Sequence, residues 1–125
     1  MVMKKIILKF NNKELILKLR NTKTAFLIYD ALPFQSKVKK WGEEIYFETP
    51  LNIDLDNDAR SVIEYGEIAF WSAGSAIAIG YGKTPVSQGD EIRLISPANV
   101  WADCEFEKEY IHSIKEGEAV SVEKF

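Results

Sequence analysis

The sequence is poor in the residues that build metal centres, disulfides and membrane spans. Its 125 residues include one cysteine and one histidine, which excludes an internal disulfide and any histidine-rich metal site. No apolar run approaches the length that crosses a bilayer, and Lys9 interrupts the apolar start of the chain before it reaches the length of a signal peptide core. We therefore expect a cytoplasmic protein with no membrane contact, no cofactor and no metal.

An excess of positive charge is also absent. Lys and Arg number 16 against 19 Asp and Glu, a net charge of −3, whereas binding along a phosphate backbone needs a clustered positive surface. Hydrophobic residues make up 46% of the chain and charged residues 28%, as in ordinary globular domains. We expect one domain over residues 1–125 that does not bind nucleic acid.

What the sequence does contain is a repeated alternation of apolar and polar residues, which is typical of strands with one buried face. The alternation begins at Ile6 and Leu8, and the asparagines that follow suit a hairpin turn. Gly42 indicates a bend between two strands, and Pro97 is expected to end another. The predicted strands are residues 4–10, 15–19, 37–41, 43–48, 66–71, 75–81, 91–95 and 119–125.

Apolar residues at helical spacing predict two helices, one over residues 25–32 and one over residues 106–114. There is no regular βαβ alternation and no internal repeat. The simplest architecture is therefore mainly β, a small closed or nearly closed barrel whose openings are capped by the helices. Within residues 75–81, Ile77 and Ile79 share one face, and the opposite face carries only small residues, so another segment can pack very close to it.

Two segments imitate ligand-binding loops without completing them. Residues 80–84 resemble the end of a phosphate-binding loop, but Ile77 stands where the earlier glycine is required. Residues 54–58 resemble the first half of a calcium loop, yet Ala59 and Tyr65 replace its glycine and its glutamate. We expect a hairpin exit and a solvated acidic loop at these places.

The single histidine and the single cysteine do not indicate catalysis. His112, which any Ser-His-Asp triad would need, is expected on the surface of the second helix. Cys104 lies between Asp103 and Glu105, whose negative charge raises the pKa of a thiol, so we expect a packed and unreactive side chain.

The segment Trp-Gly-Glu-Glu-Ile-Tyr-Phe at 41–47 is the most informative. If strand alternation holds within it, Glu43 faces the same way as Ile45 and Phe47, and Glu44 faces the other way. A carboxylate on an apolar face needs a hydrogen-bond partner or a polar cavity. Two roles stay open for Glu43: it caps backbone N–H groups near the bend, or it is the polar anchor of a pocket.

Four blocks of the sequence resemble, in order and spacing, the prokaryotic cyclophilin-like proteins of uncharacterised function. They are Leu-Pro-Phe at 32–34, Trp-Gly-Glu-Glu-Ile-Tyr-Phe at 41–47, Gly-Glu-Ile-Ala-Phe-Trp at 66–71 and Gly-Lys-Thr-Pro-Val-Ser at 82–87. The resemblance covers nearly the whole chain and implies a cyclophilin-type eight-stranded barrel with two capping helices. The chain departs from the family pattern at Ser72 and Ala73, where the family usually has two prolines, and at 80–82, where it has Phe-Phe-Gly.

The resemblance to the fold does not imply the enzymatic activity of cyclophilins. True cyclophilins are prolyl isomerases in which an arginine stabilises the twisted prolyl amide beside an apolar pocket. That arginine follows a Phe-His pair on the strand after the first helix, and residues 36–41 here contain neither arginine nor histidine. Lysine lacks the planar guanidinium fork, so we expect the fold without an efficient isomerase.

From these observations we hypothesise a module that binds an unknown small molecule or peptide in a pocket. The ligand-binding residues expected are Trp41, Glu43, Tyr46, Trp71, Thr84 and Ser87. Two alternatives stay open: a divergent prolyl isomerase that uses Lys39 or Lys40, and a structural or interaction protein that works through a strand edge or as a dimer. The sequence assigns no oligomeric state.

Overall fold

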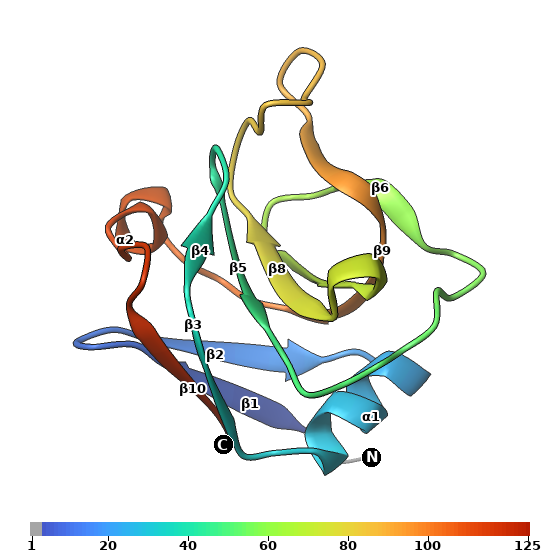
Figure 1. Ribbon diagram of the computed structural model, residues 1–125, viewed down its shortest axis with the longest axis vertical. Helices are drawn as coiled ribbons and strands as arrows, with labels where there is room; N and C mark the ends of the chain where they lie inside the picture. Colours follow the sequence, from blue (N-terminus) through green and yellow to red (C-terminus); the bar gives the residue numbers. More distant parts are fainter. Residues whose placement is uncertain (1–3) are drawn as a thin grey trace.

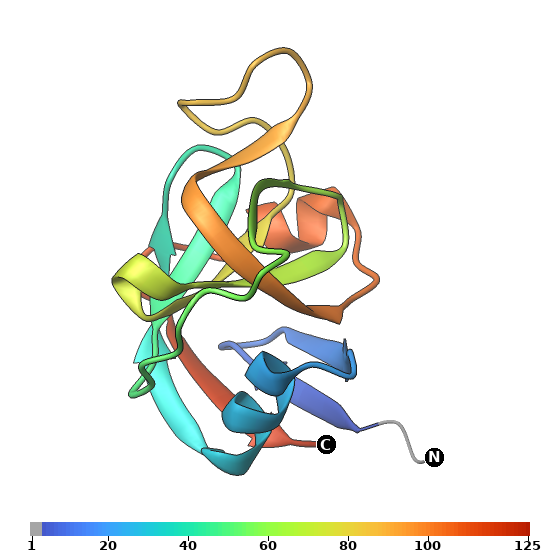
Figure 2. The same cartoon turned by 90° about the vertical axis from the view of Figure 1, so that its right-hand side faces the viewer.

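The predicted strands and helices form, and the sheet to which they belong curves into a nearly closed barrel (Figures 1 and 2). The computed structural model describes residues 4–125; residues 1–3 of the apolar start lie outside the described residues. The strands are β1 (Lys5–Lys9), β2 (Glu14–Leu19), β3 (Phe34–Lys37), β4 (Lys39–Lys40), β5 (Glu44–Glu48), β6 (Arg60–Ile63), β7 (Glu67–Trp71), β8 (Ala76–Gly80), β9 (Ile92–Asp103) and β10 (Ala119–Lys124). The helices are α1 (Lys23–Asp30) and α2 (Lys108–His112), and a 3-10 turn, η1 (Ser72–Gly74), joins β7 to β8. No helix within residues 4–125 has the length and apolar character to cross a membrane.

One segment of the chain closes the sheet. The strand order is β3-β10-β1-β2-β9-β7-β8-β5-β4, so the two ends of the sheet, β3 and β4, are consecutive pieces of residues 34–40. β3 pairs with β10, and β4 pairs with β5. Between them, the backbone N–H of Val38 donates to the carbonyl of Glu118 at 2.9 Å, and its carbonyl accepts from the N–H of Gly117 at 2.7 Å. The mainly β barrel is confirmed, and residues 4–125 form ten strands in place of the expected eight.

The inside of this barrel is filled by side chains, as in other small barrels. Ile77 and Ile79 of β8 and Trp101 of β9 are fully buried there. Ile28 of α1 and Ile111 of α2 belong to the same cluster, so both helices contribute to the main core.

The other face of β7 and β8 is buried as well. Ala69 and Ala78 pack there in a second apolar cluster with Leu94 of β9. A Cβ atom built on Gly80 would lie 2.4 Å from the Cγ2 atom of Ile92, which shows how closely the two strands approach. The small face predicted for residues 75–81 is therefore the surface on which the first half of β9 folds back.

Gly80→Ala should lower the free energy of unfolding by about 1–3 kcal/mol, because the new methyl group overlaps the side chain of Ile92 and forces local repacking. The same change should be made in a protein that carries Ile92→Ala, because this second substitution removes the methyl group with which the new side chain overlaps. Urea denaturation of the wild type, both single variants and the double variant measures the coupling. We expect the double variant to be less destabilised than the two single changes together, and strict additivity would contradict the contact.

The prediction that Pro97 ends its strand is wrong, because β9 continues through it. β9 pairs with β6 at Ile92 and Arg93 and again at Ala98, and the pairing is irregular between these positions. Pro97 lies in this irregular stretch, where its nitrogen, which has no hydrogen to donate, is not required for a hydrogen bond between the strands. β6, which is not predicted from the sequence, is the partner of this bent half (Figure 1). The bend lets one strand build the barrel wall with its second half and cover the outer face with its first.

Candidate functional site

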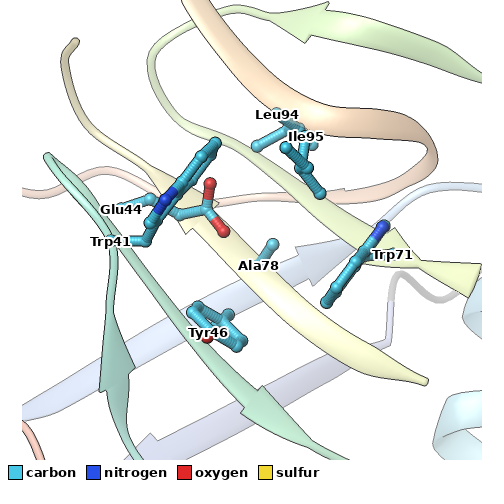
Figure 3. Close-up of a pocket in the computed structure, with 7 residues that line it drawn as sticks. All are labelled: Trp41, Glu44, Tyr46, Trp71, Ala78, Leu94 and Ile95. Carbon is cyan, nitrogen blue, oxygen red and sulfur yellow. The ribbon is translucent and has the colours of Figure 1, made fainter. Parts of the chain in front are cut away.

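A pocket of ≈ 180 Å³ lies on the outer face of the sheet, between the β4–β5 turn and the first half of β9 (Figure 3). The strand pairing sets Tyr46 and Ala69 on either side of Ala78 in one row. Because Ala78 has a short side chain, it forms a floor around which larger side chains rise. The lining residues are Trp41, Glu44, Tyr46, Trp71, Ala78, Leu94 and Ile95.

Aromatic rings form most of the walls. The rings of Tyr46 and Trp71 stand at 89° to each other with their centroids 6.1 Å apart, and Trp41 stands across the floor from Trp71 (Figure 3). The indole Nε1 of Trp71 donates to the Oγ of Ser96 at 2.7 Å. A Cβ atom built on Gly74 would lie 2.2 Å from the Trp71 ring, so the ring packs directly against this glycine. This wall is therefore fixed in place before any ligand arrives.

The polar group of the pocket is Glu44. Its carboxylate points into the space between the rings (Figure 3), and the residue is only 6% exposed. Within residues 4–125 its Oε1 atom accepts no hydrogen bond. Burial raises the pKa of this carboxyl to about 7, because the charged form has lost its water without gaining a partner.

Glu43 has a different environment. Its Oε1 accepts a hydrogen bond from the backbone N–H of Lys83 at 3.1 Å, and its Oε2 lies 3.0 Å from the Nζ of Lys108. The hydrogen bond from Lys108 holds the pKa of Glu43 below its usual value. Gly42 has a φ of +59°, and β5 begins only at Glu44, so strand alternation does not extend to Glu43. Of the two roles left open for Glu43, the hydrogen bond from the N–H of Lys83 is the contact expected for backbone capping.

The other expected residues divide between the pocket and a neighbouring loop. Trp41, Tyr46 and Trp71 are brought together by the fold. Thr84 and Ser87 lie outside the lining, where the N–H of Thr84 donates to the Oγ of Ser87 at 3.0 Å and the N–H of Ser87 donates to the carbonyl of Thr84 at 3.0 Å. These bonds shape the turn that leads into β9.

Four of the lining residues were not predicted from the sequence: Glu44, Ala78, Leu94 and Ile95. A signal for Glu44 was present, since alternation puts it on the same face as Tyr46. No local signal connects residues 94 and 95 with the β4–β5 turn, because only the bend of β9 brings them there.

All three arginine side chains are engaged in ion pairs with carboxylates. Arg60 and Arg20 both contact the carboxylate of Glu67, at 2.7 and 2.9 Å, and hydrogen bonds from these two residues and from the backbone lower the pKa of Glu67 to about 2. Arg93 is paired with Glu91. These three are all the arginines of the sequence, and none is among the pocket-lining residues.

Cys104, His112 and the acidic loop, the other candidates considered from the sequence, make contacts that stabilise the fold. Cys104 is buried, as expected, and burial raises the pKa of its thiol to about 11. His112 is exposed, as expected, with its Nδ1 2.9 Å from the hydroxyl of Tyr81. The acidic loop is anchored by the buried amide of Asn99, which donates to the carbonyl of Asp54 at 2.9 Å. Among residues 4–125, no three His, Cys, Asp or Glu side chains are grouped to hold a metal ion.

Comparison with known proteins identifies the family. The family model described as Cyclophilin-like matches residues 4–123. The solution structure of a hypothetical protein from Archaeoglobus fulgidus is similar, with 32% sequence identity and a TM-score of 0.84, over 99% of this chain and 96% of that one. No curated protein matches this chain. Since the family model covers nearly the whole sequence, the chain belongs to the cyclophilin-like family.

Proposed function

We propose that this protein is a binding module whose ligand occupies the pocket formed by Trp41, Tyr46 and Trp71, with Glu44 as its polar anchor. The observation that carries the proposal is the unpartnered Oε1 of Glu44, buried among apolar and aromatic side chains. Burying a polar atom without a hydrogen bond costs free energy, and such an atom in a concave, apolar site is typical of ligand recognition. A ligand that pairs with Glu44 would recover that cost.

If this proposal is correct, the protein should have little prolyl isomerase activity. Besides the arginines described above, the two lysines that could substitute for the cyclophilin arginine are already engaged. The Nζ of Lys39 lies 2.7 Å from the carboxylate of Glu48, and the Nζ of Lys40 donates to the carbonyl of His112 at 2.8 Å. No positive group among the lining residues is available to stabilise a twisted prolyl amide.

A protease-coupled assay on an Ala-Pro peptide tests this point. We expect kcat/KM to be lower than that of an authentic cyclophilin by about a hundredfold or more, the scale of losing the main electrostatic stabiliser of the transition state. Lys39→Ala and Lys40→Ala should leave any residual rate unchanged. A rate within about tenfold of the authentic enzyme, lost in either variant, would support the isomerase instead.

The three tryptophans provide a direct test of the pocket. Trp41 and Trp71 line it, whereas Trp101 is fully buried in the main core. In a fragment screen followed by ¹H–¹⁵N NMR, binders should shift the indole N–H signals of Trp41 and Trp71 and leave that of Trp101 in place. In Trp41→Leu, which removes one wall, the shift at Trp71 should become weaker. A screen in which no fragment moves the two pocket signals would contradict the proposal.

A further inference from the structure

We infer that the pocket recognises an organic cation, an alkylammonium head group enclosed by the rings of Trp41, Tyr46 and Trp71 and paired with the carboxylate of Glu44. This inference rests on the proposed function and names its ligand class. It comes from the combination of three aromatic walls with a buried acidic group at one site (Figure 3).

The ring geometry favours a positive ligand. The face of an aromatic ring carries negative potential, and a cation within about 6 Å of the ring centre is attracted to it. Tyr46 and Trp71 present two walls at 89°, and Trp41 closes a third side (Figure 3). Because Ser96 accepts the indole N–H of Trp71, that group is not available to an anion. An anionic ligand would meet ring faces and the Glu44 carboxylate, and the indole N–H of Trp41 and the hydroxyl of Tyr46 are the remaining side-chain donors among the lining residues.

Among residues 4–125, no basic side chain forms an ion pair with Glu44. Lys39 is paired in register with Tyr46 on the same face, but it contacts Glu48. Lys40 and Arg93, on neighbouring strands, bind the carbonyl of His112 and the carboxylate of Glu91. Desolvation is the one cause of the raised pKa of Glu44. Below pH 7 a proton neutralises the carboxylate of the free protein, and an incoming cation would replace that proton.

The size and lining of the pocket indicate a compact head group with methyl substituents. Its volume of ≈ 180 Å³ lies below the roughly 300–1,000 Å³ of sites for drug-sized ligands. Ala78, Leu94 and Ile95 add apolar surface and no side-chain hydrogen-bond donor. A substituted ammonium group, which needs few donors around it and is attracted by rings and a carboxylate, matches this lining.

A charge-matched pair of probes tests the inference. Choline and 3,3-dimethyl-1-butanol share their shape, but a carbon atom replaces the charged nitrogen in the second. Titrated at pH 8 and followed at the Trp41 and Trp71 signals, choline should bind about tenfold tighter than the alcohol, the scale of a desolvated cation–aromatic contact with a carboxylate. Its affinity should also rise about tenfold from pH 6 to pH 8 as Glu44 loses its proton, whereas that of the alcohol should not rise.

Two glutamine variants complete the test. Glu44→Gln should weaken the preference for choline, leaving only the contribution of the rings, and should remove its pH dependence, while an unshifted Trp101 signal shows that the core is intact. Glu64→Gln, the same change at an exposed position, should keep both. Equal affinity of the wild type for the two probes, or binding of uncharged fragments without binding of choline, would contradict the cationic ligand class. The proposal that the pocket binds a ligand would remain valid in that case. If no probe or fragment moves the pocket signals, both proposals fail.

Discussion

Glu44→Gln should raise the free energy of unfolding by about 3 kcal/mol at pH 8 and leave it almost unchanged at pH 4. The pKa of the Glu44 carboxyl is raised from 4.5 to about 7 by burial. Between these values the folded protein holds a proton that the unfolded chain has lost, so the stability of the wild type falls as pH rises from 4.5 to 7. Glutamine is neutral at every pH, so it avoids this loss.

Thermal or urea unfolding across pH 4 to 8 measures the effect. The wild type should lose stability relative to Glu44→Gln between about pH 4.5 and 7, and the two should converge at pH 4. The exposed control Glu64→Gln should stay within about 0.5 kcal/mol of the wild type at both ends. A variant less stable than the wild type at pH 8 would mean that the charged carboxylate has a stabilising partner. With the expected result, Glu44 reduces stability in the free protein, as functional residues often do.

Ile77→Ala should destabilise the protein by about 2–5 kcal/mol, and Ile79→Ala by a similar amount. Both side chains are fully buried in the main core, so truncation removes apolar contacts and leaves a cavity that close packing cannot easily fill. The expectation follows from the sequence alternation, and the burial of both residues agrees with it. Urea unfolding gives the free energies directly.

The matched control is Ile95→Ala, since Ile95 belongs to the opposite side of the barrel wall and is 55% exposed. It should cost less than about 1 kcal/mol, because little of its surface leaves water on folding. Equal losses at Ile95 and Ile77 would contradict the assignment of the main core to the inside of the barrel.

The parts of the fold that follow from local pattern could be predicted. The first hairpin, both helices and the pair β7–β8 rest on alternation or helical spacing, which are properties of neighbouring residues. β9 could not be predicted in full, because Pro97 is a strand terminator in most sheets and is tolerated here only where β6 leaves an irregular stretch. That exception depends on a partner strand some thirty residues earlier in the chain.

The pocket was predicted in part for a related reason. The aromatic residues of the 41–47 segment and Trp71 could be selected because large rings are informative in any context. To decide whether Glu43 or Glu44 is the carboxylate of the pocket, one must know on which side of the strand the cavity lies. Here both faces of the sheet are covered, so alternation separated the two carboxylates without showing which one faces a cavity.

The way the barrel closes sets the order in which it can be completed during synthesis. β10 lies between β1 and β3, and Val122 is paired with Leu8 on one side and with Phe34 on the other. Until residues 119–124 have left the ribosome, the first and third strands have no common neighbour, and each keeps an unpaired edge. These pairings span most of the sequence, so the closing contacts form late. A nascent chain that has not yet exposed β10 therefore has unpaired edges on β1 and β3, the kind of edge through which incompletely folded chains associate with one another.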